Sequence, residues 1–150
     1  MKSLNTSIQG RGFTLIETLI VLGLIGMIAV VGIIVGLDTY SRYIFRSDLD
    51  KTVSLLQKAR SSAINNMYES KHGVYLGDID SLILFRGTSY DSSSPYNYNV
   101  EKSKASYADT CSSVVVFDQL TGNTTNCVIT ITEGTKVSTI TINDQGGINY

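Results

Sequence analysis

An apolar run near the N-terminus constrains this 150-residue chain more than any other feature. Between Glu17 and Asp38 there is no charged residue and no Pro, and Leu, Ile and Val dominate the run TLIVLGLIGMIAVVGIIVGL. About 20 such residues in an α-helix span roughly 30 Å, which is the thickness of the hydrocarbon core of a bilayer. The run therefore predicts one membrane-spanning helix in contact with lipid.

Glu17, at the start of this run, is a carboxylate expected near membrane depth. Such an acid is costly without a partner, which makes it a candidate functional residue. The two charged residues before it, Lys2 and Arg11, are both positive. Positive charge before the run favours a cytoplasmic N-terminus and an extracytoplasmic C-terminal part. A secretory signal carries a small-residue cleavage site after its apolar run, and residues 38–42 lack one.

Residues 11–19, Arg-Gly-Phe-Thr-Leu-Ile-Glu-Thr-Leu, resemble the class III signal of type IV pilins and type II secretion pseudopilins. In that family a membrane-embedded prepilin peptidase cleaves after the Gly, and the new N-terminal Phe is N-methylated. The resemblance implies a leader peptide over residues 1–12, cleavage between Gly12 and Phe13, and methylation of Phe13. Glu17 would then be the fifth residue of the mature chain.

The resemblance also implies that Glu17 sets the register between subunits of a filament. The amine released at Phe13 of one subunit would attract Glu17 of a neighbour more strongly in hydrocarbon than in water. Each charge would also make burial of the other less costly. The alternative is that the Glu17 side chain only reaches the lipid headgroups.

Charge and motif content argue against nucleic-acid binding and against catalysis. The full chain has a formal net charge of −1, and removing residues 1–12 leaves 10 Lys and Arg against 13 Asp and Glu. A nucleic-acid-binding protein should instead show a basic excess or stripe. The chain has no Gly-rich phosphate loop and a single histidine, His72, so we expect no enzyme, no metal site and no cofactor.

The residues after the apolar run predict that the helix continues. Residues 38–67 contain neither Pro nor Gly, and apolar residues recur every three or four positions along residues 49–67. We expect a transmembrane and assembly helix over residues 13–37 and an amphipathic continuation over residues 38–70. Arg60 lies in the apolar stripe, and we expect it to pair with an acid such as Asp118 or to stack on a tyrosine.

Residues 71–150 predict a small antiparallel β-sheet domain. A polar stretch with several tyrosines, residues 87–110, predicts a long loop with at most a short strand near Tyr98. The fold class is therefore α+β, with a long N-terminal helix packed on a small antiparallel sheet, as the pilin resemblance also implies. Short strands are expected at residues 74–76, 82–86, 114–117, 128–132 and 137–142, the last three forming a meander.

The chain has two cysteines, Cys111 and Cys127. A domain translocated across the membrane meets an oxidising compartment, where two cysteines often pair. A disulfide between them would stabilise the fold by about 3 kcal/mol in the chain-entropy description. The alternative is two free thiols that pack as small hydrophobic side chains.

Three further segments, residues 55–64, 117–122 and 141–148, resemble the H-type minor pseudopilins and the FimT-like minor pilins. The resemblance implies a structural subunit of a type II secretion or type IV pilus filament, held in the inner membrane before assembly. Its partners would be the prepilin peptidase, other major and minor pilin-like subunits and the assembly platform. The alternative is a DNA-binding minor pilin of a DNA-uptake pilus. Members that bind DNA carry basic residues near the C-terminus, and residues 137–150 contain none.

Overall fold

The computed structural model describes residues 12–103 and 105–150, without the side chains of residues 33–38. The predicted leader, except for Gly12, lies outside the described residues. The chain divides into two compact units, residues 1–40 and residues 41–150. Helix α1 (Leu15–Ile64) begins in the first unit and ends in the second.

The second unit combines the C-terminal part of α1 with antiparallel sheets, so the predicted α+β class is confirmed. Among the described residues the strands form two four-stranded sheets, in the orders β3-β2-β1-β5 and β4-β6-β7-β8, with every neighbouring pair antiparallel. The elements after α1 are the 3-10 helix η1 (Met67–Glu69) and the strands β1 (His72–Tyr75), β2 (Ser81–Arg86), β3 (Tyr98–Glu101), β4 (Ser106–Asp109), β5 (Val114–Phe117), β6 (Cys127–Glu133), β7 (Lys136–Ile142) and β8 (Ile148–Asn149).

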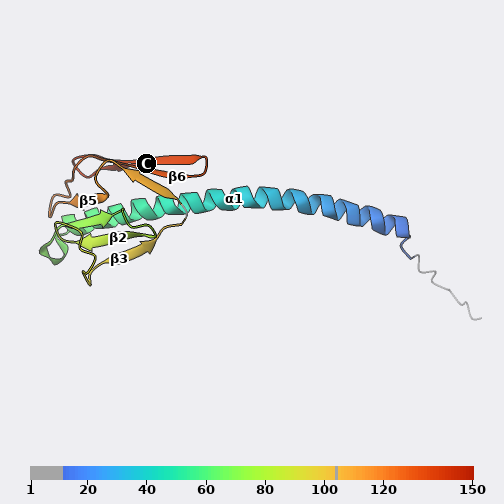
Figure 1. Ribbon diagram of the computed structural model, residues 1–150, viewed down its shortest axis with the longest axis horizontal. Coiled ribbons are helices and arrows are strands. Elements are labelled where there is room, and N and C mark those ends of the chain that lie inside the picture. The colour runs from blue at the N-terminus through green and yellow to red at the C-terminus, as the bar shows by residue number, and fades with distance from the viewer. Residues whose placement is uncertain (1–11, 104) are drawn as a thin grey trace, which may run out of the picture. The chain divides into compact units, whose positions relative to one another are not determined.

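The C-terminal part of α1 lies alongside strands of both sheets (Figure 1), and all three share one hydrophobic core. Leu56, Ala59 and Ala63 of the helix are fully buried in it. Burying one large apolar side chain contributes about 1.5–3 kcal/mol, so this shared core is the main force that holds the sheets to the helix. The first sheet contributes Val74, Leu82, Leu84, Val115 and Phe117, and the second contributes Cys127, Ile129, Ile131, Ile140 and Ile142.

The predicted apolar stripe of the helix ends earlier than expected. Met67 is 45% exposed, because α1 ends at Ile64 and the chain then turns sharply. Asn66 and Tyr68 adopt left-handed backbone angles, with φ of 52° and 57°. A helix cannot continue through such residues.

The predicted meander of the last three strands is wrong in one respect. Strands β6 and β7 pair as expected, but β5 pairs with β1 in the other sheet, with Val74 opposite Val115. The reason is that both edges of β6 are occupied, one by β7 and the other by β4. Strand β4 was not predicted, since its alternating Ser-Tyr-Ala-Asp sequence lies in the polar stretch that suggested a loop.

The long loop predicted over residues 87–110 is also shorter in the structure. Strands β3 and β4 occupy parts of it. Residues 102–103 and 105, between these two strands, belong to no helix or strand, and neither does the longer segment between β2 and β3. This segment covers the outer face of the first sheet, where Tyr90 stacks on Tyr75 with ring centroids 4.1 Å apart. Gly73 belongs to the same face: a Cβ atom there would lie 2.5 Å from the ring of Phe85.

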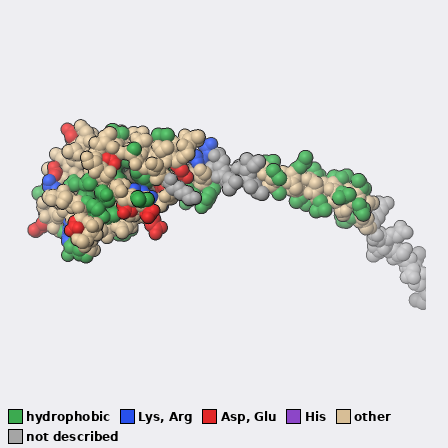
Figure 2. Space-filling view, viewed as in Figure 1, with side chains coloured by type: hydrophobic (Ala, Val, Ile, Leu, Met, Phe, Trp, Pro, Cys, Tyr) green, Lys and Arg blue, Asp and Glu red, His purple; other side chains and the backbone are tan. Residues whose placement is uncertain are grey.

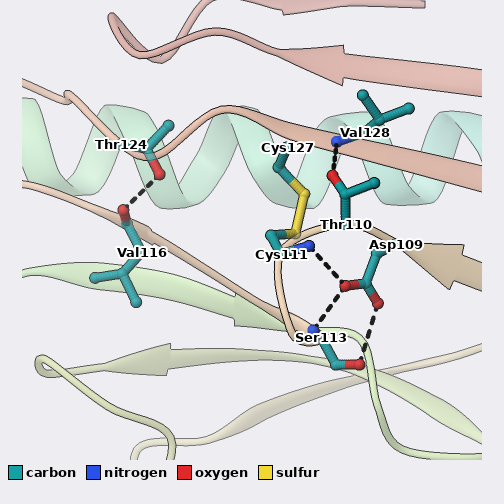
Figure 3. Close-up of a disulfide and its surroundings, with 8 residues drawn as sticks. All are labelled: Asp109, Thr110, Cys111, Ser113, Val116, Thr124, Cys127 and Val128. Atoms are coloured by element: carbon teal, nitrogen blue, oxygen red, sulfur yellow. Dashed lines mark hydrogen bonds between the residues drawn. A yellow bond between two sulfur atoms is a disulfide. The ribbon is translucent and has the colours of Figure 1, made fainter.

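A disulfide joins Cys111 to Cys127, with the two Cα atoms 5.3 Å apart (Figure 3). Cys111 follows β4, and Cys127 is the first residue of β6, which pairs with β4 in the second sheet. Strand β5, which lies between the two cysteines in sequence, belongs to the first sheet. The disulfide therefore ties together the points where the chain leaves the second sheet and where it returns.

The turn after β4 is fixed by a carboxylate as well as by the disulfide (Figure 3). Asp109 accepts hydrogen bonds from the amides of Cys111 and Ser113 at 3.0 and 2.7 Å, and from the Ser113 hydroxyl at 3.1 Å. Ser112 and Ser113 both have positive φ, of 57° and 62°. These bonds offset the cost of the left-handed backbone.

A buried acid, Asp48, fastens α1 to the segment between β3 and β4. Asp48 is fully buried and accepts hydrogen bonds from the Ser103 amide at 3.0 Å and the Ser103 hydroxyl at 2.8 Å. One turn later, Thr52 is also fully buried, and its hydroxyl lies 3.2 Å from that of Tyr107. Burial raises the pKa of Tyr107 to about 12. These polar contacts position the helix between the sheets, in addition to the hydrophobic core.

Replacing both cysteines by Ser should lower the free energy of unfolding of the folded unit by about 3 kcal/mol. The physical reason is that the unlinked unfolded chain gains conformational freedom across the segment that contains β5. Chemical denaturation of the protein in detergent, followed by near-ultraviolet circular dichroism, would measure the change. A reductant should destabilise the original protein to the same extent and leave the double variant unaffected; equal stability of the two proteins would contradict the prediction.

Asp48→Asn should lower the free energy of unfolding by about 1.5–3 kcal/mol, the worth of hydrogen bonds to a charged group. The amide keeps the size of the side chain but replaces one acceptor oxygen by a donor that faces the Ser103 donors. Urea denaturation of the same preparation would measure the loss. Asp50→Asn, at an exposed position one half-turn away, is the control and should change stability by no more than about 0.5 kcal/mol.

Candidate functional site

The predicted processing segment lies immediately before α1. Gly12 and Phe13 are outside the helix and exposed, and the Phe13 side chain retains 79% of its accessible surface. Thr14 caps the helix: its carbonyl accepts hydrogen bonds from the amides of Glu17 and Thr18 at 3.1 and 3.2 Å. A Cβ atom added to Gly12 would have no atom within 4 Å, apart from those of the residues next to it in the chain. The Gly12–Phe13 peptide bond is therefore open to a partner protein.

The large apolar side chains of α1 between Leu15 and Val31 are exposed, and Figure 2 shows many of them on the visible face of this segment. Among the described residues one helical segment, Leu15–Gly32, is long and apolar enough to cross a membrane, with a mean hydropathy of 2.5. None of its side chains is buried within the chain. Isolated helices gain little from helix propensity alone in water, and a helix that is apolar on all faces is typical of a membrane span or a helix packed among other helices.

Glu17 lies in the first turn of α1, four residues after Phe13. Its side chain is exposed, and within the described part of the chain no group forms a hydrogen bond or an ion pair with its carboxylate. The positive end of the helix dipole favours an acid at this position. The dipole alone contributes about 0.3–1 kcal/mol, which is less than the cost of a carboxylate in hydrocarbon. In a bilayer, Glu17 would therefore be costly to bury without a cationic partner. The predicted leader cations, Lys2 and Arg11, lie outside the described residues.

The predicted site residues fall into the two units. Gly12, Phe13 and Glu17 are grouped within the first unit, around the start of α1. Cys111 and Cys127 belong to the second unit, where they form the disulfide and not two free thiols.

The partners expected for Arg60 are wrong. Asp118 forms an ion pair with Lys71 at 2.6 Å, and Arg60 donates a hydrogen bond to the Gln145 carbonyl at 3.1 Å. Arg60 lies along the turn that contains Gly146, where φ is +72° and a Cβ atom would be 2.8 Å from the Arg60 Nε. The guanidinium therefore helps to fix the turn between β7 and β8.

The single histidine has a structural position in the second unit. His72 is buried, and its Nε2 lies 2.9 Å from the carbonyl oxygen of Met67. Among residues 12–103 and 105–150, no three His, Cys, Asp or Glu side chains are grouped as ligands of a metal ion.

Sequence reasoning missed a cluster of cations and tyrosines at the surface of the second unit. The Arg86 guanidinium lies over the rings of Tyr96 and Tyr68, with its Cζ 3.7 and 4.7 Å from the two centroids. The Lys58 ammonium lies 4.4 Å from the centroid of Tyr98. The tyrosine-rich polar stretch before β3 was the sequence feature that could have indicated this cluster. The sequence does not show which cation those tyrosines contact.

Comparison of the chain with family models, with curated proteins and with solved structures gives no match.

Proposed function

We propose that this chain is a minor pilin or pseudopilin, a structural subunit of a filament assembled from the inner membrane. The observation that carries the proposal is the start of α1: an exposed Gly12–Phe13 bond, then an apolar helix with no internal partner, and an unpaired Glu17 in its first turn. These features match the class III signal that residues 11–19 resemble.

Before assembly the apolar segment of α1 would be embedded in the bilayer as a single pass. Lys2 and Arg11 would hold the N-terminus in the cytoplasm, and the unit of residues 41–150 would be extracytoplasmic. The disulfide supports this placement, because disulfides persist in oxidising compartments. The prepilin peptidase would cleave after Gly12 and methylate the amine of Phe13.

After cleavage the chain would begin with a cation four residues from Glu17. At about 4 Å, opposite unit charges attract by roughly 1 kcal/mol in water and by about 4 kcal/mol at an effective dielectric constant of 20. The apolar surfaces of neighbouring helices would allow them to slide along one another. A pair between Phe13 of one subunit and Glu17 of the next would select one stagger.

The partners in this proposal are the prepilin peptidase, other pilin-like subunits and the assembly platform. Nucleic acid is not among them, since the mature chain is net acidic and residues 137–150 carry no Lys or Arg.

Gly12→Leu should leave the precursor uncut when it is produced together with a prepilin peptidase. A bulky side chain at this position blocks access to the Gly12–Phe13 peptide bond. Mass spectrometry of the intact membrane protein would show a chain that still carries residues 1–12, whereas the original protein should begin with methylated Phe13. Gly10→Leu, also in the leader, is the control and should be processed. An original protein that keeps Met1 under these conditions would refute the proposal.

Glu17→Val should be cleaved normally but should enter filaments at least about 100-fold less than the original protein. Breaking a buried ion pair by removing one partner costs about 3–5 kcal/mol, and about 1.4 kcal/mol corresponds to a factor of ten. Immunoblots of sheared filaments, normalised to the membrane pool, would measure incorporation. Thr18→Val is the matched control, because the Thr18 hydroxyl only bonds the Leu15 carbonyl of its own helix. Normal incorporation of Glu17→Val would exclude the register role.

A further inference from the structure

The cluster around Arg86 has the properties of a binding site. Arg86 ends β2, Tyr68 follows α1, and Tyr96 precedes β3, so three separate segments meet there. Tyr68 and Tyr96 are 70% and 63% exposed. Their rings cover the flat surface of the guanidinium. Within the described residues, no oxygen accepts a hydrogen bond from the Arg86 N–H groups, so the edge of the guanidinium is available to a ligand.

Both tyrosines are held in place by their own segments. The turn that carries Tyr68 is fixed by hydrogen bonds from the Gln119 amide to the Asn66 side chain and from the Glu69 amide to the Asn66 carbonyl. The left-handed backbone at Tyr68 is a strained conformation that these contacts maintain.

The loop that carries Tyr96 is equally ordered. Asp91 accepts hydrogen bonds from the Ser93 amide at 2.9 Å and the Ser93 hydroxyl at 2.8 Å, and these bonds lower the pKa of its carboxyl group. The Asn97 side chain donates to the Asp91 carbonyl at 2.8 Å. Because hydrogen bonds order both segments that carry the tyrosines, less of this surface would have to be ordered when a ligand binds.

The cavity beside this cluster has a volume of about 300 Å³ and a positive lining. Lys58 and Arg86 line it, and none of the described residues that line it is Asp or Glu. Met67, Leu84, Phe85 and the two tyrosines form much of its remaining wall, and Ser62 and His72 complete the lining. An anion bound there would meet two cations and would be partly shielded from water, which strengthens the attraction.

We infer that this cavity binds a carboxylate presented by a partner protein, with the Arg86 guanidinium as its bidentate donor. The planar fork of an arginine matches the two oxygens of a carboxylate and forms two parallel hydrogen bonds. Tyr, Met and Arg are the residue types enriched at protein interfaces, and arginine and tyrosine dominate their binding energy. The inference stands on the unit of residues 41–150 and is independent of the proposed filament function.

Charge favours an acidic protein segment over nucleic acid as the occupant. Affinity for a polyanion depends on many phosphate contacts and a basic surface, whereas the chain is net acidic and this cavity holds two cations. One carboxylate side chain on an apolar body fits both the charge and the volume of the cavity.

Titration of the full-length protein in zwitterionic detergent with three probes at constant ionic strength tests the inference. The probes are the peptide acetyl-Gly-Glu-Gly-amide, its Gln counterpart and an oligothymidylate. Nuclear magnetic resonance of the arginine Nε–H groups and tyrosine rings reports binding, and the Arg86 signal is identified by its loss in Arg86→Lys. The Glu peptide should shift the signals of Arg86, Tyr68 and Tyr96 saturably, and the Gln peptide should not.

Arg86→Lys keeps the charge but loses the fork, so it should weaken binding of the Glu peptide at least about tenfold. Tyr68→Leu, which leaves the guanidinium in place, should weaken it as well and serves if Arg86→Lys does not fold. Lys136→Gln, in β7 of the other sheet, is the control and should bind as the original protein does. Equal response to the Gln peptide, no saturable shift, full affinity in Arg86→Lys, or Arg86-dependent binding that is tighter for the oligothymidylate would each overturn the inference.

Discussion

The structure depends on two requirements of one helix, α1: its C-terminal part must bury one stripe of side chains, and its N-terminal part must cover an apolar surface. The first requirement is met inside the chain, because Leu56, Ala59 and Ala63 are fully enclosed by the two sheets. The second is not met inside the chain, since no side chain of Leu15–Gly32 is buried. The hydrophobic effect therefore folds the second unit and leaves the first to lipid or other helices.

The sheets remain on the helix because polar contacts complement the hydrophobic core at a few points. Asp48, on the buried side of α1, accepts hydrogen bonds from the segment between β3 and β4. Arg60 donates a hydrogen bond to the turn between β7 and β8. The disulfide acts on the connection that passes from one sheet to the other and back. The Asp48 and Arg60 contacts join the helix to segments that the strand ladders do not connect to it, whereas the disulfide reinforces the paired ends of β4 and β6.

The two candidate interaction sites use charge in opposite ways. Glu17 is an acid on an apolar helix that lacks a cation, and Arg86 is a cation on a tyrosine-lined cavity that lacks an acid. Within the described part of the chain, no cation forms an ion pair with Glu17 and no acid forms one with Arg86. Unsatisfied charges in apolar or aromatic surroundings are costly unless a partner supplies the counter-charge. Both are therefore candidate sites of interaction with other molecules.

The sequence by itself determined the apolar segment, the amphipathic continuation of the helix, and the alternation that buries Ile129 and Ile131 in β6, because these are local periodic patterns. It also identified the segment that contains Gly12, Phe13 and Glu17, because that motif is defined by the order of neighbouring residues. Only the tertiary structure decided that β5 pairs with β1, that Asp48 meets Ser103, and that Arg86 meets Tyr68 and Tyr96. Asp48 and Ser103 are 55 residues apart, and Arg60 and Gln145 are 85 apart. Contacts at such separations depend on which edge of a strand is already occupied and on where the folded chain brings a side chain, and no local pattern records either.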